Sequence, residues 1–381
     1  MGSRRGHGEG SIYYRKDREC WCAMVDLSVE GSKRKRKAIF GKTRREVADK
    51  LKAVLHDQQQ GLPVAVERQT LDQFITRWLS EVVAQRTRPK THQSYSEIAR
   101  LHIIPTLGKI QLSKLSPQDV QRLMNDKLAE GLSPRTVTYI RAVLRMALAQ
   151  ALKWGMVARN VATLVDPPKT EQAAITVLSP TQARTLLDAA RGDRLEALYR
   201  VALSLGLRRG EALGLRWQDV DLERGILRVE VALQVMVGVA PALVAPKTVN
   251  SRRTLPLPPM LVSALRAHRA RQLEERLCAG TRWQDHDLVF STSIGTPINP
   301  PNLVRTFHRL LERAGLPPMR FHDLRHSCAT LLAAQGVPAR VAMDILGHSD
   351  IRVTQNIYTH VFDDAKRQAS DAMQRLFGTT E

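Results

Sequence analysis

Five short motifs in the second half of the sequence contain residue types that can bind an anion and move protons. They are Gly206–Glu211 (GLRRGE), Pro246–Thr248 (PKT), His322–His326 (HDLRH), Leu346–His348 (LGH) and Asn356–Tyr358 (NIY). An arginine stays charged and can donate two parallel hydrogen bonds to a phosphate. Histidine exchanges protons near neutral pH, and a tyrosine can act as a covalent nucleophile. Each motif is weak alone, but their order and the ten-residue spacing between His348 and Tyr358 are specific.

Other fragments that resemble cofactor sites lack an essential part. His322 and His326 have a spacing that suits two metal ligands, but Arg325 would place a fixed positive charge beside the cation. The segment Phe40–Thr43 resembles the end of a phosphate-binding loop, yet the position of its first glycine holds Arg36. We therefore expect neither a metal nor a nucleotide cofactor.

In the five motifs the sequence resembles the tyrosine recombinase family, the integrases and site-specific recombinases of phages, mobile elements and bacteria. The match spans the C-terminal half of the chain. The resemblance implies that Tyr358 attacks a scissile phosphate, giving a covalent 3′-phosphotyrosyl intermediate and a free 5′-hydroxyl that later attacks a partner strand. Because the phosphotyrosine conserves the bond energy, no nucleotide hydrolysis is needed.

The chemistry explains why cations must surround that phosphate. Cleavage of a phosphodiester without Mg²⁺ concentrates negative charge on the non-bridging oxygens, and Arg208 and Arg325 are suited to stabilise it. Tyr358 also needs help, since a free phenol has a pKa of ~10 and its ionisation at pH 7 costs roughly 4 kcal/mol.

The resemblance assigns the remaining roles. His322 is implied as the general base and Lys247, on the turn of a β-hairpin, as the general acid that protonates the departing 5′ oxygen. His348 would donate to the phosphate. Glu211 would orient Arg208 as a supporting carboxylate. Taken singly, each of these residues has an ordinary structural interpretation, and only their joint occurrence favours catalysis.

The length of 381 residues allows two or three domains, and we predict three. Residues 1–62 should form a small α+β domain, with a three-stranded sheet from segments 11–15, 21–27 and 37–40 and a helix that begins after Thr43. The sequence resembles the arm-type DNA-binding domains that some integrases carry at this position.

Residues 68–166 should form an all-α domain that binds core DNA sites. The apolar stripe Leu71, Phe74, Ile75, Trp78, Leu79 and Val82 has helical spacing and predicts a buried face. Further helices are expected to begin after Ser116 and after Ser133.

Residues 175–381 should form the catalytic domain, after a proline-led linker at 166–174. We expect helices at about 179–190 and 195–205, β-segments near 225–235 and 251–257, and helices from 259 onward. The fold class is thus multidomain, with a mostly α catalytic domain that contains a small β-sheet.

The charge favours nucleic acid as a partner. Lys and Arg number 58 against 37 Asp and Glu, a formal net charge of +21. The basic run 33–37 lies between two predicted strands, where a solvated hairpin is the alternative to phosphate contact. The DNA-contacting candidates are Arg15, Lys16, Lys33, Arg34, Lys35, Arg36, Lys37, Lys90, Arg135 and Arg141.

The family resemblance implies double-stranded DNA as substrate, with core sites and arm sites, and a homotetramer on DNA in which the 363–377 helix could contact a neighbour. It also leaves room for an accessory DNA-bending or excision factor. We favour a phage or mobile-element integrase over a chromosome-dimer-resolving recombinase because of the extra N-terminal domain. A catalytically idle DNA-binding protein, a relaxing topoisomerase and a metal-dependent nuclease are the rival hypotheses.

The compartment follows from what the sequence lacks. Four cysteines, Cys20, Cys22, Cys278 and Cys328, form no disulfide framework, and the first residues show no signal-peptide pattern. The longest apolar run, 235–245, is too short to span a bilayer. We expect a cytoplasmic protein, associated with the nucleoid when bound to DNA, and no membrane partner.

Overall fold

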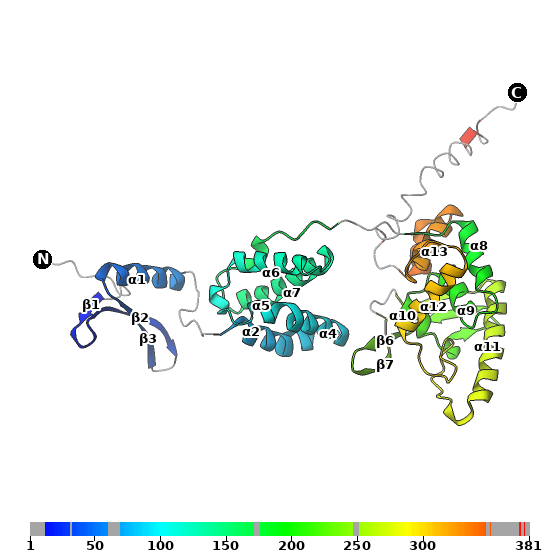
Figure 1. Ribbon diagram of the computed structural model, residues 1–381, viewed down its shortest axis with the longest axis horizontal. Coiled ribbons are helices and arrows are strands. Elements are labelled where there is room, and N and C mark those ends of the chain that lie inside the picture. Colours follow the sequence, from blue (N-terminus) through cyan, green and yellow to red (C-terminus); the bar gives the residue numbers. More distant parts are fainter. Residues whose placement is uncertain are drawn as a thin grey trace. The chain divides into compact units, whose positions relative to one another are not determined.

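The computed structural model describes residues 12–30, 33–59, 69–170, 176–246, 251–347, 351, 373–374 and 377. The chain divides into two compact units, residues 1–172 and 173–381, and Figure 1 labels many of their helices and strands. Three predicted catalytic residues, Lys247, His348 and Tyr358, lie outside the described residues, as does the predicted 363–377 helix except for three positions.

The N-terminal part of the first unit is an antiparallel sheet of order β1-β2-β3, with β1 Ile12–Arg15, β2 Cys20–Glu30 and β3 Lys33–Gly41, followed by helix α1, Arg44–Gln59. The predicted three strands and helix are confirmed. Ala23, Val25, Ile39, Val47 and Leu51 form its core. As predicted, the Thr43 hydroxyl accepts from the amide of Glu46, at 3.2 Å, at the start of α1.

One expectation about this sheet is wrong. The basic run Lys33–Lys37 is not a connection between strands; it forms the first half of β3, in register with β2 from Glu30↔Lys33 to Val25↔Lys37. Five consecutive cations are compatible with a strand of an antiparallel sheet, which can have a solvated face, so a run of charged residues does not by itself indicate a turn.

The second part of this unit is all helical. It comprises α2 Leu71–Trp78, the π-helical turn η2 Leu79–Val83, α3 Ala84–Arg86, α4 Pro89–Ile98, the π-helical turn η3 Ala99–Ile103, α5 Ile104–Leu107, α6 Pro117–Ala129 and α7 Pro134–Lys153, with short 3₁₀ turns at Leu112–Lys114 and Val161–Leu164. The predicted stripe is confirmed as core: Leu71, Phe74, Ile75, Trp78 and Leu79 are buried and Val82 packs against them.

Two caps show why these helices begin where the sequence predicts. Ser116 accepts from the amide of Asp119 and Ser133 from the amide of Thr136, each followed by a proline at the first helical position. The side chain of Asp119 also accepts from the Ser116 amide at 3.0 Å, which completes a capping box.

The second unit is a helical domain with two small sheets. Its helices are α8 Pro180–Ala189, α9 Glu196–Leu205, α10 Arg209–Leu213, α11 Pro259–Ala279, α12 Pro300–Arg313, α13 Asp323–Ala334 and α14 Ala339–Leu346. One sheet has the order β4-β5-β8 (Val220–Asp221, Ile226–Val229, Arg253–Pro256), and the other pairs β6 Ala232–Met236 with β7 Val239–Val244. One core, which includes Leu198, Tyr199, Phe290, Phe307 and Leu324, holds them together.

The predicted hairpin turn that carries Lys247 lies outside the described residues, which stop at 246 and resume at 251. The described strands before and after it, β7 and β8, belong to different sheets. The hairpin that the structure describes in this region is β6–β7, which reverses direction near Gly238 at φ +73°, nine residues before Lys247.

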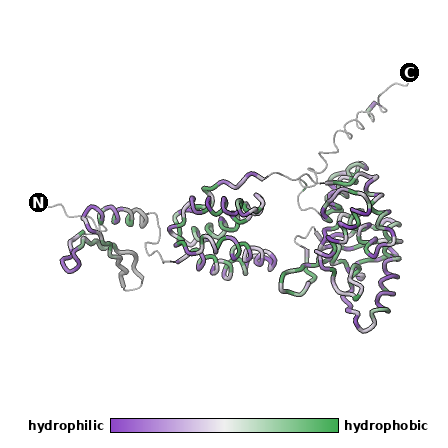
Figure 2. The backbone as a smooth tube through the Cα atoms, viewed as in Figure 1, coloured by the Kyte–Doolittle hydropathy of each residue, from purple (hydrophilic) through white to green (hydrophobic). Residues whose placement is uncertain are grey.

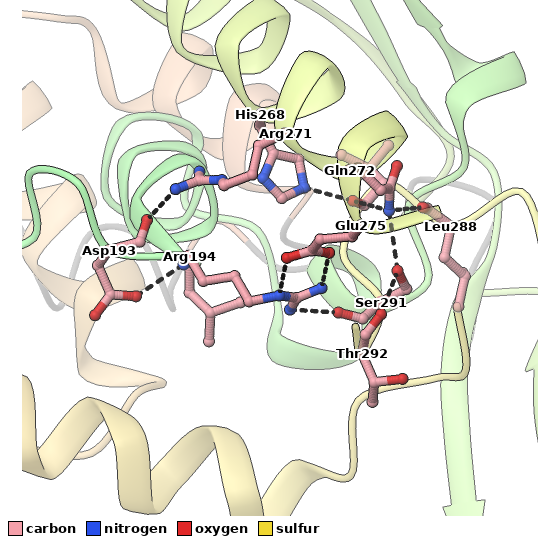
Figure 3. A network of polar contacts seen from close by, with 11 residues as sticks. Asp193, Arg194, His268, Arg271, Gln272, Glu275, Leu288, Ser291 and Thr292 are labelled. Carbon is pink, nitrogen blue, oxygen red and sulfur yellow. Dashed lines mark hydrogen bonds and ion pairs between the residues drawn. The ribbon is translucent and has the colours of Figure 1, made fainter. Parts of the chain in front are cut away.

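A polar network fixes the long helix α11 to the rest of this unit (Figure 3). Arg194 donates Nε and Nη2 to the two carboxylate oxygens of Glu275, both at 2.6 Å, and Nη1 to the carbonyl of Ser291 at 2.7 Å. Gln272 donates to the carbonyl of Leu288 at 3.0 Å and to Oγ of Ser291 at 2.9 Å. The network ties the α8–α9 loop, α11 and segment 288–292 into one body.

Replacing Arg194 with alanine is expected to lower the free energy of unfolding by about 2 kcal/mol, because it removes three charge-assisted hydrogen bonds and leaves the half-buried Glu275 without its partner. This corresponds to a drop of about 4 to 8 °C in Tm. Arg191→Ala is the matched control, since Arg191 is exposed and forms an ion pair with Asp188 at the surface. Equal melting temperatures for the two variants would contradict the structural role of the network.

Hydropathy changes along the helices within short distances, as Figure 2 shows for both units. Among the described residues no helix is both long and apolar enough to cross a membrane.

Candidate active site

The turn between α9 and α10 places the first predicted arginine. Helix α9 ends at Gly206, whose φ of +59° is the left-handed conformation that glycine adopts at helix ends. A Cβ at this position would lie 2.4 Å from Cδ2 of Leu346, so only glycine fits. Two residues later Arg208 precedes the first turn of α10, and its amide donates to Oε2 of Glu211 at 3.1 Å.

Glu211 is the buried carboxylate of the site, with 4 % of its surface exposed. Its Oε1 accepts from Nη1 of Arg208 at 2.6 Å, and its Oε2 accepts from Nη2 of Arg253 at 3.0 Å. Burial alone would raise the pKa of Glu211, but the charges and hydrogen bonds of Arg253 and Arg208 outweigh it and hold the pKa below its ordinary value. Glu211 is therefore ionised and orients Arg208.

Arg325, in the first turn of α13, is the second predicted arginine. Only 3 % of its surface is exposed, and its Nη1 donates to the carbonyl of Gly206 at 2.7 Å. Its Nη2 is buried and has no hydrogen-bond partner among the described residues. Burial and the positive charges of Arg208 and Arg253 lower its pKa to about 9. A buried guanidinium with an unused hydrogen-bond donor, close to other positive charges, is well suited to bind an anion.

His322 stands at the N-terminus of α13, one turn before His326. The two rings are nearly perpendicular, with centroids 5.4 Å apart. Desolvation, with His326 and Arg325 as further causes, lowers the pKa of His322 to about 4. His322 is neutral at pH 7 and can accept a proton.

The side chain of Asp323, which lies between these two histidines in the sequence, is bound to Arg320. It accepts hydrogen bonds from three nitrogens of Arg320, its amide at 2.9 Å, Nε and Nη2, and is 3 % exposed. In the part of the chain that the structure describes, no group of three or more His, Cys, Asp and Glu residues could hold a metal ion.

The end of α14 reaches the same site. Nη2 of Arg208 donates to the carbonyl of Gly347 at 2.7 Å, although the two residues are 139 positions apart. Gly347 has φ +66° and is followed directly by His348. Thus the structure brings together Arg208, Glu211 and Arg325, with His322 beside them and with the segment before His348 bound to Arg208.

The sequence interpretation missed Arg253, which is buried and bonded to Glu211. Its signal lies in the strand alternation of β8: Arg253 is two residues before Leu255, which is 3 % exposed, so both side chains belong to the same face of the strand. An arginine on the buried face of a predicted strand indicates a buried ion pair.

The predicted DNA-contacting residues lie at the surface where the structure describes them. Lys16, Lys90 and Arg135 are exposed, and Arg15 and Arg141 are partly exposed. Arg15 is bonded to Asp17, whereas the buried Nε of Arg141 has no partner among the described residues.

The chain matches the Phage integrase family over residues 176–365 and the phage integrase N-terminal SAM-like domain over residues 70–128. It is 34 % identical to the tyrosine recombinase XerC-like protein of Caldanaerobacter subterraneus subsp. tengcongensis, over 96 % of this chain and 98 % of that protein.

Two solved structures share the fold. The Tn1549 transposon integrase in complex with a circular intermediate DNA gives a TM-score of 0.68 at 22 % identity, over 81 % of this chain and 99 % of the other. A lambda integrase tetramer bound to a Holliday junction gives 0.57 at 18 %, over 93 % and 96 %. The predicted fold class is thereby confirmed. The chain belongs to the phage integrase family of tyrosine recombinases and is a site-specific DNA recombinase.

Proposed function

We propose that this recombinase cleaves DNA by attack of the Tyr358 oxygen on the scissile phosphorus, with Arg208 and Arg325 bound to the non-bridging oxygens. The observation that carries the proposal is the Arg325 guanidinium, which is 3 % exposed and keeps a buried Nη2 without a partner in the described part of the chain. Such a preorganised donor costs no rearrangement when negative charge develops on the phosphate.

The proton transfers follow from the neighbouring residues. The neutral His322 accepts the phenol proton of Tyr358, the Tyr358 O–P bond forms and the P–O5′ bond breaks. Lys247 gives a proton to the departing 5′ oxygen, and His348 donates a hydrogen bond to the phosphate. The reverse attack by a 5′-hydroxyl on the phosphotyrosine rejoins a strand, so the linkage is conserved throughout.

A nicked duplex that carries a candidate site, incubated with the protein in EDTA, tests the proposal. The nick lets the short 5′-hydroxyl fragment leave, so that a covalent protein–DNA adduct accumulates and is visible on a denaturing gel. An adduct formed in EDTA supports the mechanism. Loss of the adduct in EDTA would contradict metal-free cleavage.

The pH dependence of cleavage reports on His322. The single-turnover rate should stay level as the pH falls from 8 to about 6.5, the pKa of an ordinary histidine, because the lowered pKa keeps His322 unprotonated there. It should decline only at lower pH. His322→Gln should cleave about 10²-fold more slowly and lose this acid limb, whereas the exposed His308→Gln should change neither. A cleavage rate of the wild-type protein that already declines at or above pH 6.5 would contradict this role of His322.

For the rest of the chain we propose that residues 68–166 bind the core DNA site and residues 1–62 bind separate arm-type sites, with residues 175–381 as the catalytic domain. The candidates for phosphate contact are the exposed or partly exposed Arg15, Lys16, Lys90, Arg135 and Arg141, together with the basic run Lys33–Lys37. The net charge of +21 supports contact with DNA.

Removal of residues 1–62 is expected to leave the covalent adduct on a core site intact but to weaken recombination. The slope of log Kobs against log salt for long DNA should become shallower by about 3 to 5, since up to five phosphate contacts of the basic run are lost. Replacing Lys33, Arg34, Lys35, Arg36 and Lys37 by glutamine in the full chain is the companion variant. An unchanged slope in both would contradict an arm-binding role.

Two solved structures with this fold support a proposal for the assembly and the biological role. The lambda integrase tetramer is bound to a Holliday junction, and the transposon integrase to a circular intermediate DNA. We propose that this chain likewise acts as a homotetramer on double-stranded DNA, in the cytoplasm and at the nucleoid. There it would integrate, and also excise, a phage or mobile element, with an accessory DNA-bending or excision factor setting the direction.

A further inference from the structure

Arg253 lies at the start of β8 with its side chain almost completely buried, at 7 % exposure. Each of the three guanidinium nitrogens donates a hydrogen bond. Nη2 donates to Oε2 of Glu211 at 3.0 Å, Nε donates to the carbonyl of Ile345 at 2.7 Å, and Nη1 donates to the carbonyl of Ser251 at 3.1 Å. One planar group therefore joins three segments that are distant in sequence.

Each of those segments carries a proposed catalytic residue. Glu211 holds Arg208, Ser251 follows Lys247 by four residues, and Ile345 precedes His348 by three. The backbone before His348 also lies against the guanidinium, because a Cβ on Gly347 would come within 2.9 Å of Nη1 of Arg253. The Arg253 guanidinium therefore fixes the path of the backbone at residues 345–347, directly before His348.

If Arg253 served stability alone, an apolar side chain would stabilise this buried position at least as well as an ion pair. Among the described residues, Glu211 is the carboxylate that Arg208 and Arg253 share, and Arg325 adds a third charge whose pKa both arginines lower. Buried cations that repel one another cost stability, and apolar residues of similar size are often at least as stable in such positions. An arginine at this buried position therefore indicates a requirement for its directed hydrogen bonds.

The two carboxylate oxygens of Glu211 accept from the guanidinium groups of different arginines, and this arrangement shows why the hydrogen bonds of Arg253 are needed. Oε2 accepts from Arg253 and from the Arg208 amide, so the carboxylate is held in one orientation and presents Oε1 to Nη1 of Arg208. Arg208 then keeps a fixed plane, with Nη2 on the carbonyl of Gly347. Without Arg253, the charge of Glu211 would be shared with no second arginine and would neutralise Arg208 more fully, which would weaken the binding of Arg208 to a phosphate.

We propose that Arg253 is a positioning residue for strand cleavage: through Glu211, Ser251 and Ile345 it fixes the segments of Arg208, Lys247 and His348 around one phosphate. The proposal rests on the function proposed above. It assigns Arg253 no contact with DNA, so its effect must appear in the rate of cleavage and not in the affinity for the site.

The test compares Arg253→Met with Arg252→Met on a nicked duplex from which the wild-type protein forms the covalent adduct. Arg252 is the neighbouring residue, but its side chain is 59 % exposed and its ion-pair partner is Glu230 at 3.7 Å. Arg253→Met should bind the duplex as tightly as wild type and cleave it about 10²-fold more slowly, as expected for misplaced catalytic groups. Arg252→Met should cleave within about threefold of wild type.

Two modified duplexes separate positioning from a general loss of folded protein. In one, sulfur replaces the bridging 5′ oxygen, so the P–S bond breaks and a thiolate leaves without a proton from Lys247. In the other, a neutral methylphosphonate replaces the scissile phosphate and lowers the demand on Arg208 and His348. The Arg253→Met defect should shrink at least tenfold on one or both. An equal defect on all three duplexes, or an equal defect in Arg252→Met, would overturn the proposal.

Arg253→Lys keeps the test valid if the methionine variant does not fold. A lysine retains the charge beside Glu211 but lacks the planar fork that reaches three acceptors, so cleavage should still be impaired. Wild-type rates for Arg253→Lys would overturn the three-way role. If the wild-type protein forms no adduct through Tyr358, the proposed function fails; if it does and the Arg253 variants match it, only this inference fails.

Discussion

Tyr358→Phe is expected to abolish the covalent protein–DNA adduct while leaving site binding within about twofold of wild type. The phenol oxygen is the atom that would form the bond to phosphorus, and phenylalanine removes that atom while keeping the ring. The measurement is a denaturing gel of the nicked duplex after incubation in EDTA, combined with a binding assay under the same salt. Because the nucleophile itself is lost, cleavage should fall below detection.

Tyr199→Phe is the matched control for this change. Tyr199 lies in the core of the same unit, fully buried, and its hydroxyl has no hydrogen-bond partner among the described residues. Removing that hydroxyl should cost nothing in stability or cleavage, since no hydrogen bond is lost. An adduct that persists in Tyr358→Phe would show that another side chain is the nucleophile, and peptide mapping of the adduct would identify it.

Arg325→Met should have the second largest effect, with cleavage of bound DNA slowed about 10²- to 10³-fold. The same variant should melt at the wild-type temperature or above it. The lowered pKa of Arg325 means that its charged form is disfavoured in the folded protein, by burial first and by Arg208 and Arg253 after it. A methionine of similar length removes that cost, so activity and stability should change in opposite directions.

Single-turnover cleavage and a thermal melt measure the two effects of Arg325→Met. Arg191→Met, at an exposed position of the same unit, should leave both unchanged. A large fall in Tm for Arg325→Met would mean that the arginine is structural. Weakened binding with a normal rate of cleavage of the bound DNA would also contradict its assigned role on the phosphate.

The helical part of the fold could be predicted because local signals and tertiary packing agree there. Ser116, Ser133 and Thr43 cap helices where their hydroxyls predict them, and the stripe from Leu71 to Leu79 is buried as its spacing requires. The π-helical turns at Leu79–Val83 and Ala99–Ile103 have no comparable local signal. They depend on how the bundle packs, which single-sequence periodicity does not contain.

Polar and charged segments were harder to interpret. The run Lys33–Lys37 has too many like charges to suggest a strand, yet it pairs with β2 along its length. β7 and β8 follow each other among the described strands but belong to different sheets, because strand partners are set by contacts between distant segments and not by proximity in the chain. Arg253 shares this difficulty: an arginine next to another arginine suggests surface, and only its distant partner Glu211 shows that it is buried.

The site itself was predictable in outline because its chemistry demands particular residue types in a particular order. The structure brings Arg208, Glu211, Arg325 and His322 together, as that order predicts. The catalytic roles of all these residues stay predictions, and Lys247, His348 and Tyr358 lie outside the described residues. The sequence does not show where each side chain points. The hydrogen bond from Arg208 to the carbonyl of Gly347, for example, could not be predicted from it.

That last hydrogen bond has a consequence for the time at which the protein becomes able to cut DNA. Arg208 leaves the ribosome long before Gly347, its partner 139 residues later. Until α14 has been made and packed, the Arg208 guanidinium lacks the carbonyl that it bonds to in the folded chain. A chain that stops short of Gly347 therefore cannot hold Arg208 in this orientation, even when the earlier helices of the unit have folded.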